Sequence, residues 1–431
     1  MFGLSYGWFL GLPLAAALIG IVLSRIRLPL RWPVLLTALL CVGVVAVAFW
    51  AGPLGHLVQE RSLVSRSAAL VGAGAAGGFC WARWQRRGPS PLEALAAVAL
   101  LGLALVDVPV VRSGFLRDLH LYLRAGSDFV SGQPYYTLSA LTAPPSDPTE
   151  LPFLYPPFTI PFFAILSQLP RLLVDAAWVG GALVAVLGSL RLLGLAWRWV
   201  VLLFIWPPFI QGIWVGNVDV FTYALFVLAP WFAVGLAFVP IFKIQAGIMS
   251  LWLLRERRWR ALVLGGLAVG LLVLVTLPIV GLNAWADWIQ ALQAFAESAA
   301  RYPSMRGQAL NRLLPTPLII LLTIGGVALA FWRSGRVSLA VLGLASLPAS
   351  PTLYIHGFNV ALPGLLSLRA WPFWLGMTAM AGTRNIGAWW VFLLVAGGAH
   401  VLIGLRHRPD QAEAAAHPLA RLDAPWPLAP T

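Results

Sequence analysis

The sequence predicts an all-α polytopic membrane protein with about 11–13 transmembrane helices and external interfacial loops. Of its 431 residues, 60% are hydrophobic and 10% are charged, with a mean hydropathy of +0.85. That composition carries more apolar surface than a water-soluble globule can bury. Apolar runs close to the ~20 residues that a membrane-crossing helix needs recur along the chain. Basic residues stand in short clusters between these runs, a pattern typical of cytoplasmic loops.

The first part of the chain contains four apolar runs, near 5–24, 33–51, 64–82 and 91–111. Arginine clusters follow the first and the third run, at 25–31 and 83–87. The links at those clusters are therefore predicted to be cytoplasmic, and the polar stretch 112–153 is expected outside. No short apolar core with a small-residue cleavage site opens the chain, so the first run is expected to be a retained anchor.

The second part contains nine more apolar runs, near 155–169, 172–193, 200–214, 217–240, 261–280, 315–332, 337–350, 353–368 and 386–405. The densest basic cluster, at 255–260, is predicted to be cytoplasmic, which makes 281–312 a second external loop. Pro230 interrupts one of the runs, so residues 217–243 form one span, two short spans or a re-entrant hairpin. Broken helices at membrane depth are tolerated where they line a cavity, so this ambiguity itself points to a site.

Three regions follow from this pattern. Residues 1–88 form N-terminal extra transmembrane helices, 89–405 form the transmembrane core, and 406–431 form a proline-rich tail expected to be disordered. The formal charge of +14 is spread over the links and is not gathered on a polar domain, so we expect no nucleic-acid partner. Cys41 and Cys80 both lie in apolar runs, which indicates neither a disulfide framework nor a metal site.

The polar stretch 112–153 contains the first candidate for chemistry. Asp118, Tyr122 and Ala125 recur at helical spacing, which predicts a short interfacial helix with the carboxylate on one face. A carboxylate at the outer membrane boundary, shielded from bulk water, is suited to act as general base on an acceptor hydroxyl. The alternative is a solvated aspartate at the start of a helix.

Four further residues stand out in apolar surroundings. Lys243 is the only lysine among 29 basic residues and has no acidic neighbour in sequence, so it calls for an anionic partner such as a phosphate. The alternative is a lysine that extends to the membrane interface. His356 lies at an external helix end and is expected either to be a structural hydrogen bonder or to bind a phosphate or orient an acceptor hydroxyl. Asp219 and Asp107 are acids near apolar sequence, and each could equally be a buried, paired structural group.

The order of several motifs resembles glycosyltransferase family 87, polytopic membrane enzymes of the GT-C class that use polyprenol-phosphate mannose. The first motifs are Asp118, Tyr122, Gly132-Gln-Pro-Tyr135 and Tyr155-Pro-Pro-Phe158. The later motifs are Gly216-Asn217, the helix ending in Lys243, the basic turn 255–262, Gly307-Gln-Ala-Leu310 and Ser350-Pro351 to His356. The resemblance covers about 91–370. This chain departs from the family pattern at Asn217, which replaces Gln, at Gly307 and Ala309, which replace Asn and Ser, and at Tyr354, which replaces Trp.

The resemblance implies a GT-C-like helical bundle in which Asp118 is the catalytic base and His356 lines the active site. Lys243 would bind the lipid phosphate. The other residues expected to contact substrate are Tyr122, Tyr135, Tyr155, Asn217, Asp219 and Gln308. The donor would be a polyprenyl-phosphate sugar, with mannose expected, and the acceptor a glycolipid or glycan. Transfer would proceed by an inverting single displacement, on the external face of the cell membrane, among membrane lipids and without metal or cofactor.

The sequence is compatible with two other functions. A polytopic secondary transporter or lipid flippase would use Lys243 and Asp219 as substrate or ion sites at broken helices. The chain shows no inverted repeat, however, and its polar residues gather toward one face of the membrane. A catalytically degenerate GT-C scaffold protein is the second reading, because the element at 307–310 has lost its Asn and Ser.

Overall fold

The computed structural model describes residues 115–136, 152–195 and 206–366, with a few separate residues at 200, 203–204, 390, 393–394, 397–398 and 401–402. The spans predicted at 5–24, 33–51, 64–82 and 91–111, and the tail at 406–431, lie outside these residues. The chain divides into two compact units. One unit comprises 1–113, 197–210 and 368–396, and the other comprises 114–196, 211–367 and 397–431. The second unit contains almost everything described, and the elements below belong to it except the start of α9.

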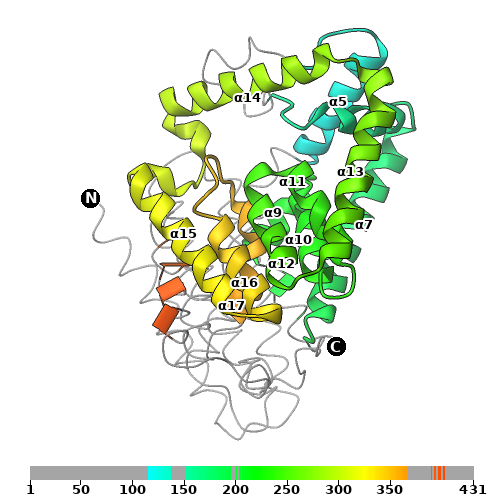
Figure 1. The fold of residues 1–431 in the computed structure, drawn as a ribbon. Coiled ribbons are helices and arrows are strands. Elements are labelled where there is room, and N and C mark those ends of the chain that lie inside the picture. Colours follow the sequence, from blue (N-terminus) through cyan, green and yellow to red (C-terminus); the bar gives the residue numbers. More distant parts are fainter. Residues whose placement is uncertain are drawn as a thin grey trace, which may run out of the picture. The chain divides into compact units, whose positions relative to one another are not determined.

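The described residues fold into helices, and their one β-bridge joins two loops. The α-helices are α5 Arg117–Val130, α6 Ile160–Ser167, α7 Arg171–Leu192, α9 Pro207–Val215, α10 Asp219–Leu228, α11 Val239–Phe242, α12 Leu251–Arg255, α13 Trp259–Val280, α14 Asn283–Arg301, α15 Thr316–Trp332, α16 Gly335–Ser346 and α17 Leu362–Leu366 (Figure 1). Short 3-10 helices connect them: η4 Pro157–Thr159, η5 Ala233–Phe238, η6 Ile244–Ser250, η7 Pro303–Arg306, η8 Leu310–Arg312 and η9 Ile355–Ala361.

Two helices, α7 and α13, are long and apolar enough to cross a membrane. Each has 22 residues and is therefore ~33 Å long, against a hydrocarbon core of ~30 Å. Large apolar side chains of α13 point away from the protein, among them Leu267 and Leu271, which are 64% and 62% exposed. Such outward apolar faces are typical of helices in lipid, and with the composition they identify a helical membrane protein. The total of 11–13 spans stays a prediction.

The interfacial helix predicted within 112–153 is present as α5, whose buried face includes Asp118, Tyr122 and Ala125. The apolar run that follows does not cross a membrane, because α6 has only eight residues, or ~12 Å. Instead α6 packs against α5. At Gly126 a Cβ atom would overlap the backbone of Phe163 in α6, so glycine allows the close approach of the two helices.

The path of residues 217–255 excludes a single unbroken span, which was one of the alternatives that the sequence left open. After α10, the chain turns at 229–232, runs back through η5 and α11 to Lys243, and returns through η6 and α12. The Ser250 hydroxyl donates to the Leu236 carbonyl at 2.6 Å, which joins the two arms of this hairpin. Residues 217–243 are therefore two short segments, and α10, at ten residues or ~15 Å, is half as long as the hydrocarbon core is thick.

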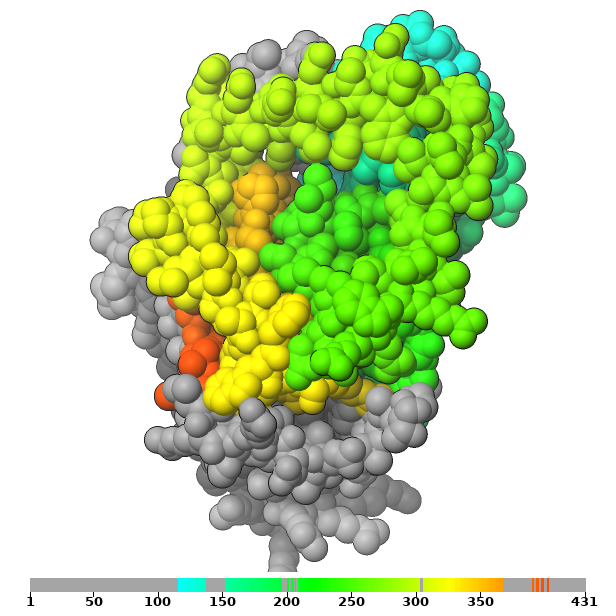
Figure 2. Space-filling model, viewed as in Figure 1, coloured from blue at the N-terminus to red at the C-terminus, as the bar shows by residue number. Residues whose placement is uncertain are grey.

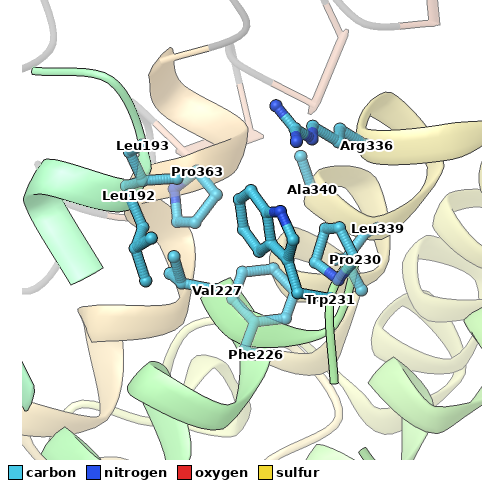
Figure 3. A pocket seen from close by; sticks show the side chains of 10 residues that line it. All are labelled: Leu192, Leu193, Phe226, Val227, Pro230, Trp231, Arg336, Leu339, Ala340 and Pro363. Atoms are coloured by element: carbon cyan, nitrogen blue, oxygen red, sulfur yellow. The ribbon is translucent and has the colours of Figure 1, made fainter. Parts of the chain in front are cut away.

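The turns at 229–232, 251–258 and 333–336 lie at one end of the unit. Trp252 Nε1 donates to the Gly335 carbonyl at 2.7 Å, and the Gly335 N–H donates to Glu256 at 2.9 Å. The Arg336 guanidinium lies 5.0 Å from the centroid of the Trp231 ring. A small cavity of about 20 Å³ at this end is lined by apolar side chains and Arg336 (Figure 3). Its lining residues include no carboxylate or imidazole suited to acid–base chemistry.

The other end of the unit carries α5 and α14, the helices of the two predicted external loops (Figure 1). Trp288 Nε1 on α14 donates to the Leu154 carbonyl at 3.0 Å, and the Trp285 ring lies 5.9 Å from Phe158. Ala291 enters the same buried cluster as Tyr122 on α5. Figure 2 shows the surface hollowed beneath α14, between α15 and α11, with the segment near 350–360 visible inside.

Candidate functional site

The Asp118 carboxylate lies in the first turn of α5 and is buried, with 5% of the residue exposed. This rules out the solvated aspartate that was its alternative. Its Oδ1 accepts from Arg117 Nε at 2.9 Å, and its Oδ2 accepts from the Asn217 amide at 2.6 Å. Leu116, just before the helix, has the left-handed φ of 53°, uncommon for a residue with a Cβ atom. Its N–H donates to the Trp214 carbonyl at 2.7 Å, which ties the start of α5 to the segment before Asn217.

Gly216 and Asn217 connect Asp118 to α10. Gly216 has a φ of 70°, and a Cβ atom there would lie 2.9 Å from Leu119 Cβ, so the turn and the close approach of α5 both favour glycine. The Asn217 amide nitrogen donates to Asp118, while its Oδ1 accepts the N–H of Asp219 at 2.9 Å. One side chain therefore joins the Asp118 carboxylate to the backbone of Asp219.

Asp219 is the centre of the polar cluster. It is 4% exposed, and its Oδ2 contacts Lys243 Nζ at 2.6 Å and His356 Nδ1 at 2.7 Å. Lys243, isolated in the sequence, thus has an anionic partner within the chain. Because an ammonium group has three N–H donors and Asp219 accepts one, Lys243 retains donors for a second anion. The side chain of Lys243 is 21% exposed and lines a cavity.

His356 is held on three sides. Its backbone N–H donates to Gln211 at 2.9 Å, and its ring stacks on Tyr354 at 5.8 Å between centroids. An ionised carboxylate only accepts hydrogen bonds, so Nδ1 carries the proton toward Asp219 and Nε2 is the nitrogen left for another group. The residue is 3% exposed.

The motif at 307–310 is joined to the segment before His356. Gly307 forms a parallel β-bridge with Leu353, and the Gln308 N–H donates to the Leu353 carbonyl. Gly307 has a φ of 57°, and a Cβ atom there would lie 2.5 Å from the Leu353 oxygen. Glycine fits this position better than asparagine, which tolerates the left-handed region but would meet the same oxygen. Gln308 is therefore attached to this end of the unit through its backbone.

The predicted tyrosines separate into two groups. The hydroxyls of Tyr122 and Tyr155 are 3.1 Å apart, and burial, with the adjoining phenol and Asp118, raises the pKa of Tyr122 well above its ordinary value. Both rings therefore stay protonated beside Asp118. Tyr135 instead packs on Phe129 and Tyr136, and burial together with the charge of Asp287 raises its pKa. Tyr135 thus lies outside the polar cluster.

Asp118, Lys243 and His356, predicted to share one site, are joined by a continuous chain of contacts through Asn217 and Asp219. A small cavity of about 20 Å³ adjoins Asp219 and Lys243, whereas Asp118 and His356 are not among its lining residues. Sequence reasoning missed Arg117, Gln211 and Asn359. Arg117 could have been predicted from its position next to Asp118. For Gln211 and Asn359 the only sequence feature was a polar residue within an apolar run.

Comparisons with known proteins show what the chain is similar to. The model of glycosyltransferase family 87 matches residues 153–351. A polyprenol-phosphate-mannose-dependent alpha-(1-2)-phosphatidylinositol pentamannoside mannosyltransferase from Mycolicibacterium smegmatis is 26% identical over 349 residues, which are 73% of this chain and 82% of the relative. No solved structure matches the chain. The helical membrane fold and these matches define a membrane glycosyltransferase. The family model covers 199 of the 431 residues, and over this stretch the chain is similar to glycosyltransferase family 87, in line with its ordered motifs.

Proposed function

We propose that this protein transfers mannose from a polyprenyl-phosphate donor to a hydroxyl of a glycolipid or glycan on the external face of the cell membrane. The observation that carries the proposal is the contact chain from Asp118 through Asn217 and Asp219 to Lys243 and His356. It places a buried carboxylate and a cation with spare donors in one rigid cluster. The Mycolicibacterium smegmatis relative, by its name, uses polyprenol-phosphate mannose, which supports the choice of donor.

In this proposal Asp118 is the general base. Each carboxylate oxygen has two lone pairs, so the contacts with Arg117 and Asn217 leave room for an acceptor hydroxyl. As Asp118 takes the hydroxyl proton, the oxygen attacks the anomeric carbon from the face opposite the phosphate. The bond from the anomeric carbon to the phosphate oxygen breaks, and its electron pair leaves with polyprenyl phosphate. One displacement inverts the anomeric centre and requires no second carboxylate nucleophile.

Lys243 and His356 would stabilise the departing phosphate. Fixed donors aimed at developing negative charge lower the barrier because they need no reorganisation during the reaction. Asp219 holds the Lys243 ammonium and the His356 ring at once, which leaves two Lys243 donors for the phosphate oxygens. His356 Nε2 would also donate to them in the imidazolium form, in which both ring nitrogens carry protons. The donor brings its own leaving group, so the proposal requires neither a metal nor a cofactor.

Two observations support the proposed external location: the positions of the arginines and the direction of α13. The basic cluster at 255–260 precedes α13, and α14 follows it at the end that carries α5. If the cluster is cytoplasmic, as arginine-rich links are, Asp118 lies toward the opposite side. This arrangement supports a multi-pass protein whose active site opens outward.

The test is sugar transfer from polyprenyl-phosphate mannose by the full-length protein in liposomes. Asp118→Asn keeps the shape of the side chain but removes the base, so transfer should fall by on the order of 100- to 10,000-fold. Asp128→Asn, the same substitution further along α5, is the matched control and should retain activity. Wild-type transfer by Asp118→Asn would refute the role of Asp118. Movement of the donor across the membrane without transfer, by the wild type, would favour a transporter.

A further inference from the structure

Arg117 is the first residue of α5, and its guanidinium covers the carboxylate proposed as the base. Its Nε donates to Asp118 Oδ1 at 2.9 Å, and one of its terminal nitrogens, Nη2, lies 2.9 Å from the same oxygen. The Arg117 side chain is 22% exposed and that of Asp118 is 7% exposed, so the guanidinium is the accessible part of the pair. A molecule that approaches the pair therefore meets the cation before it meets the carboxylate.

The guanidinium has donors to spare, whereas the carboxylate is nearly filled. A guanidinium carries five N–H groups, and Arg117 forms no hydrogen bond or ion pair with any described residue other than Asp118. Asp118 Oδ1 faces both nitrogens of Arg117, and Oδ2 accepts from the Asn217 amide at 2.6 Å, which leaves one lone pair on Oδ2. As it stands, the pair is better suited to bind an anion than to accept the proton of a hydroxyl.

The position of Arg117 relates it to the leaving group of the proposed reaction. Tyr354 lies in the loop before η9, and its ring stacks on the His356 ring at 5.8 Å between centroids. Burial raises the pKa of the Tyr354 phenol, the positive charge of Arg117 lowers it, and the negative charge of Asp118 raises it less strongly than Arg117 lowers it. Of the two charged groups, the guanidinium is thus the nearer to the tyrosine that covers His356, where the phosphate would bind.

We propose that Arg117 is a further phosphate-binding residue, whose guanidinium moves from Asp118 Oδ1 to the donor phosphate when the donor binds. This inference rests on the proposed function. An arginine fork binds two phosphate oxygens at once, and the bonds to phosphate, like those to Asp118, join full charges. The exchange therefore keeps the guanidinium paired with an anion. It also frees both lone pairs of Oδ1 for the acceptor hydroxyl, so the base becomes accessible only when the donor is in place.

The experiment measures the binding of polyprenyl phosphate, which lacks the sugar, to the full-length protein in lipid nanodiscs, with uncharged polyprenol as the comparison ligand. Arg117→Met removes charged hydrogen bonds, so it should weaken the binding of polyprenyl phosphate by roughly 10-fold or more and leave that of polyprenol unchanged. Arg124→Met, at an exposed arginine of the same helix, is the matched control and should bind both ligands as wild type does. Arg117→Lys keeps the charge without the fork and should give an intermediate affinity. It also serves if the methionine variant does not fold.

The movement is tested with a second pair of variants. Asp118→Asn weakens the contact that Arg117 has to leave, so this variant should bind polyprenyl phosphate more tightly than wild type by roughly 3- to 10-fold. In Arg117→Met combined with Asp118→Asn, that gain should disappear. An arginine that only held Asp118 in place would change the rate of transfer and leave the affinity for the phosphate as it is.

Two results would overturn the inference. If the folded Arg117 variants bind polyprenyl phosphate as tightly as wild type, Arg117 does not contact the phosphate. If Asp118→Asn gives no gain in affinity, or if the gain persists in the double variant, the guanidinium does not exchange one anion for the other. Neither result bears on the proposed transfer reaction, which fails separately if the wild type transfers no sugar from polyprenyl-phosphate mannose.

Discussion

The ion pair between Asp219 and Lys243 makes a prediction about stability that can be separated from activity. At 2.6 Å and an effective dielectric constant of about 20, the two charges attract by about 6 kcal/mol. Part of this is offset by desolvation, and removing one partner of a buried pair typically costs about 3–5 kcal/mol. We expect Asp219→Asn to lose that much stability, because it leaves the Lys243 ammonium without a counter-charge. The apparent Tm of this 431-residue chain should fall by roughly 3–6 °C.

The assay is thermal unfolding of the purified protein in detergent, followed for the two single variants and their combination. Asp219→Asn with Lys243→Met removes both charges, so the double variant should be at least about 2 kcal/mol more stable than the sum of the single effects. It should remain inactive, since the donors for the phosphate are gone. Asp175→Asn, which breaks a partly exposed pair with Arg171, is the control and should cost about 0–1 kcal/mol. Additivity of the two single effects to within about 0.5 kcal/mol would refute the coupling.

Three further predictions concern packing and orientation. Gly126→Ala should lower stability by about 1–3 kcal/mol, because its Cβ atom would overlap the backbone of α6, whereas Gly188→Ala, with open space around it, should be neutral or slightly stabilising in a melting assay. Gly307→Ala should reduce transfer and stability together, since the bridge to Leu353 leaves no room for a Cβ atom; unchanged kinetics would argue against that bridge. Ser131→Cys, exposed after α5, should react with an impermeant thiol reagent added outside intact cells; reaction only after permeabilisation would place α5 in the cytoplasm.

Elements that obey a simple length or charge rule could be predicted from the sequence. The helices α7 and α13 agree with apolar runs of suitable length, and the turn between α15 and α16 agrees with the arginines at 333–336. The helical spacing of Asp118 and Tyr122 predicted α5 and its buried face. These features depend on neighbours within a few turns of the chain, which is the range that hydrophobic periodicity reports.

The polar cluster could be predicted only in part, because its contacts join distant residues. Asp219 meets His356 across 137 positions and Lys243 across 24, and nothing in their local sequence specifies that pairing. The shortness of α6 was also hidden, since its apolar run continues beyond the residues that are helical. The local sequence did not single out Asn359, because the feature that distinguishes it is a buried amide without hydrogen-bond partners among the described residues. The resemblance to family 87 supplied the order of the motifs, and the fold brings several of them together.

The central claim is that the donor phosphate binds Lys243 on the side of the cluster that faces Asp118. A structure of the full-length protein with bound polyprenyl-phosphate mannose measures this directly. The proposal predicts phosphate oxygens about 3 Å from Lys243 Nζ and His356 Nε2, with the anomeric carbon between them and Asp118. Phosphate bound in the cavity beside Trp231 and Arg336, at the opposite end of the unit, would contradict it.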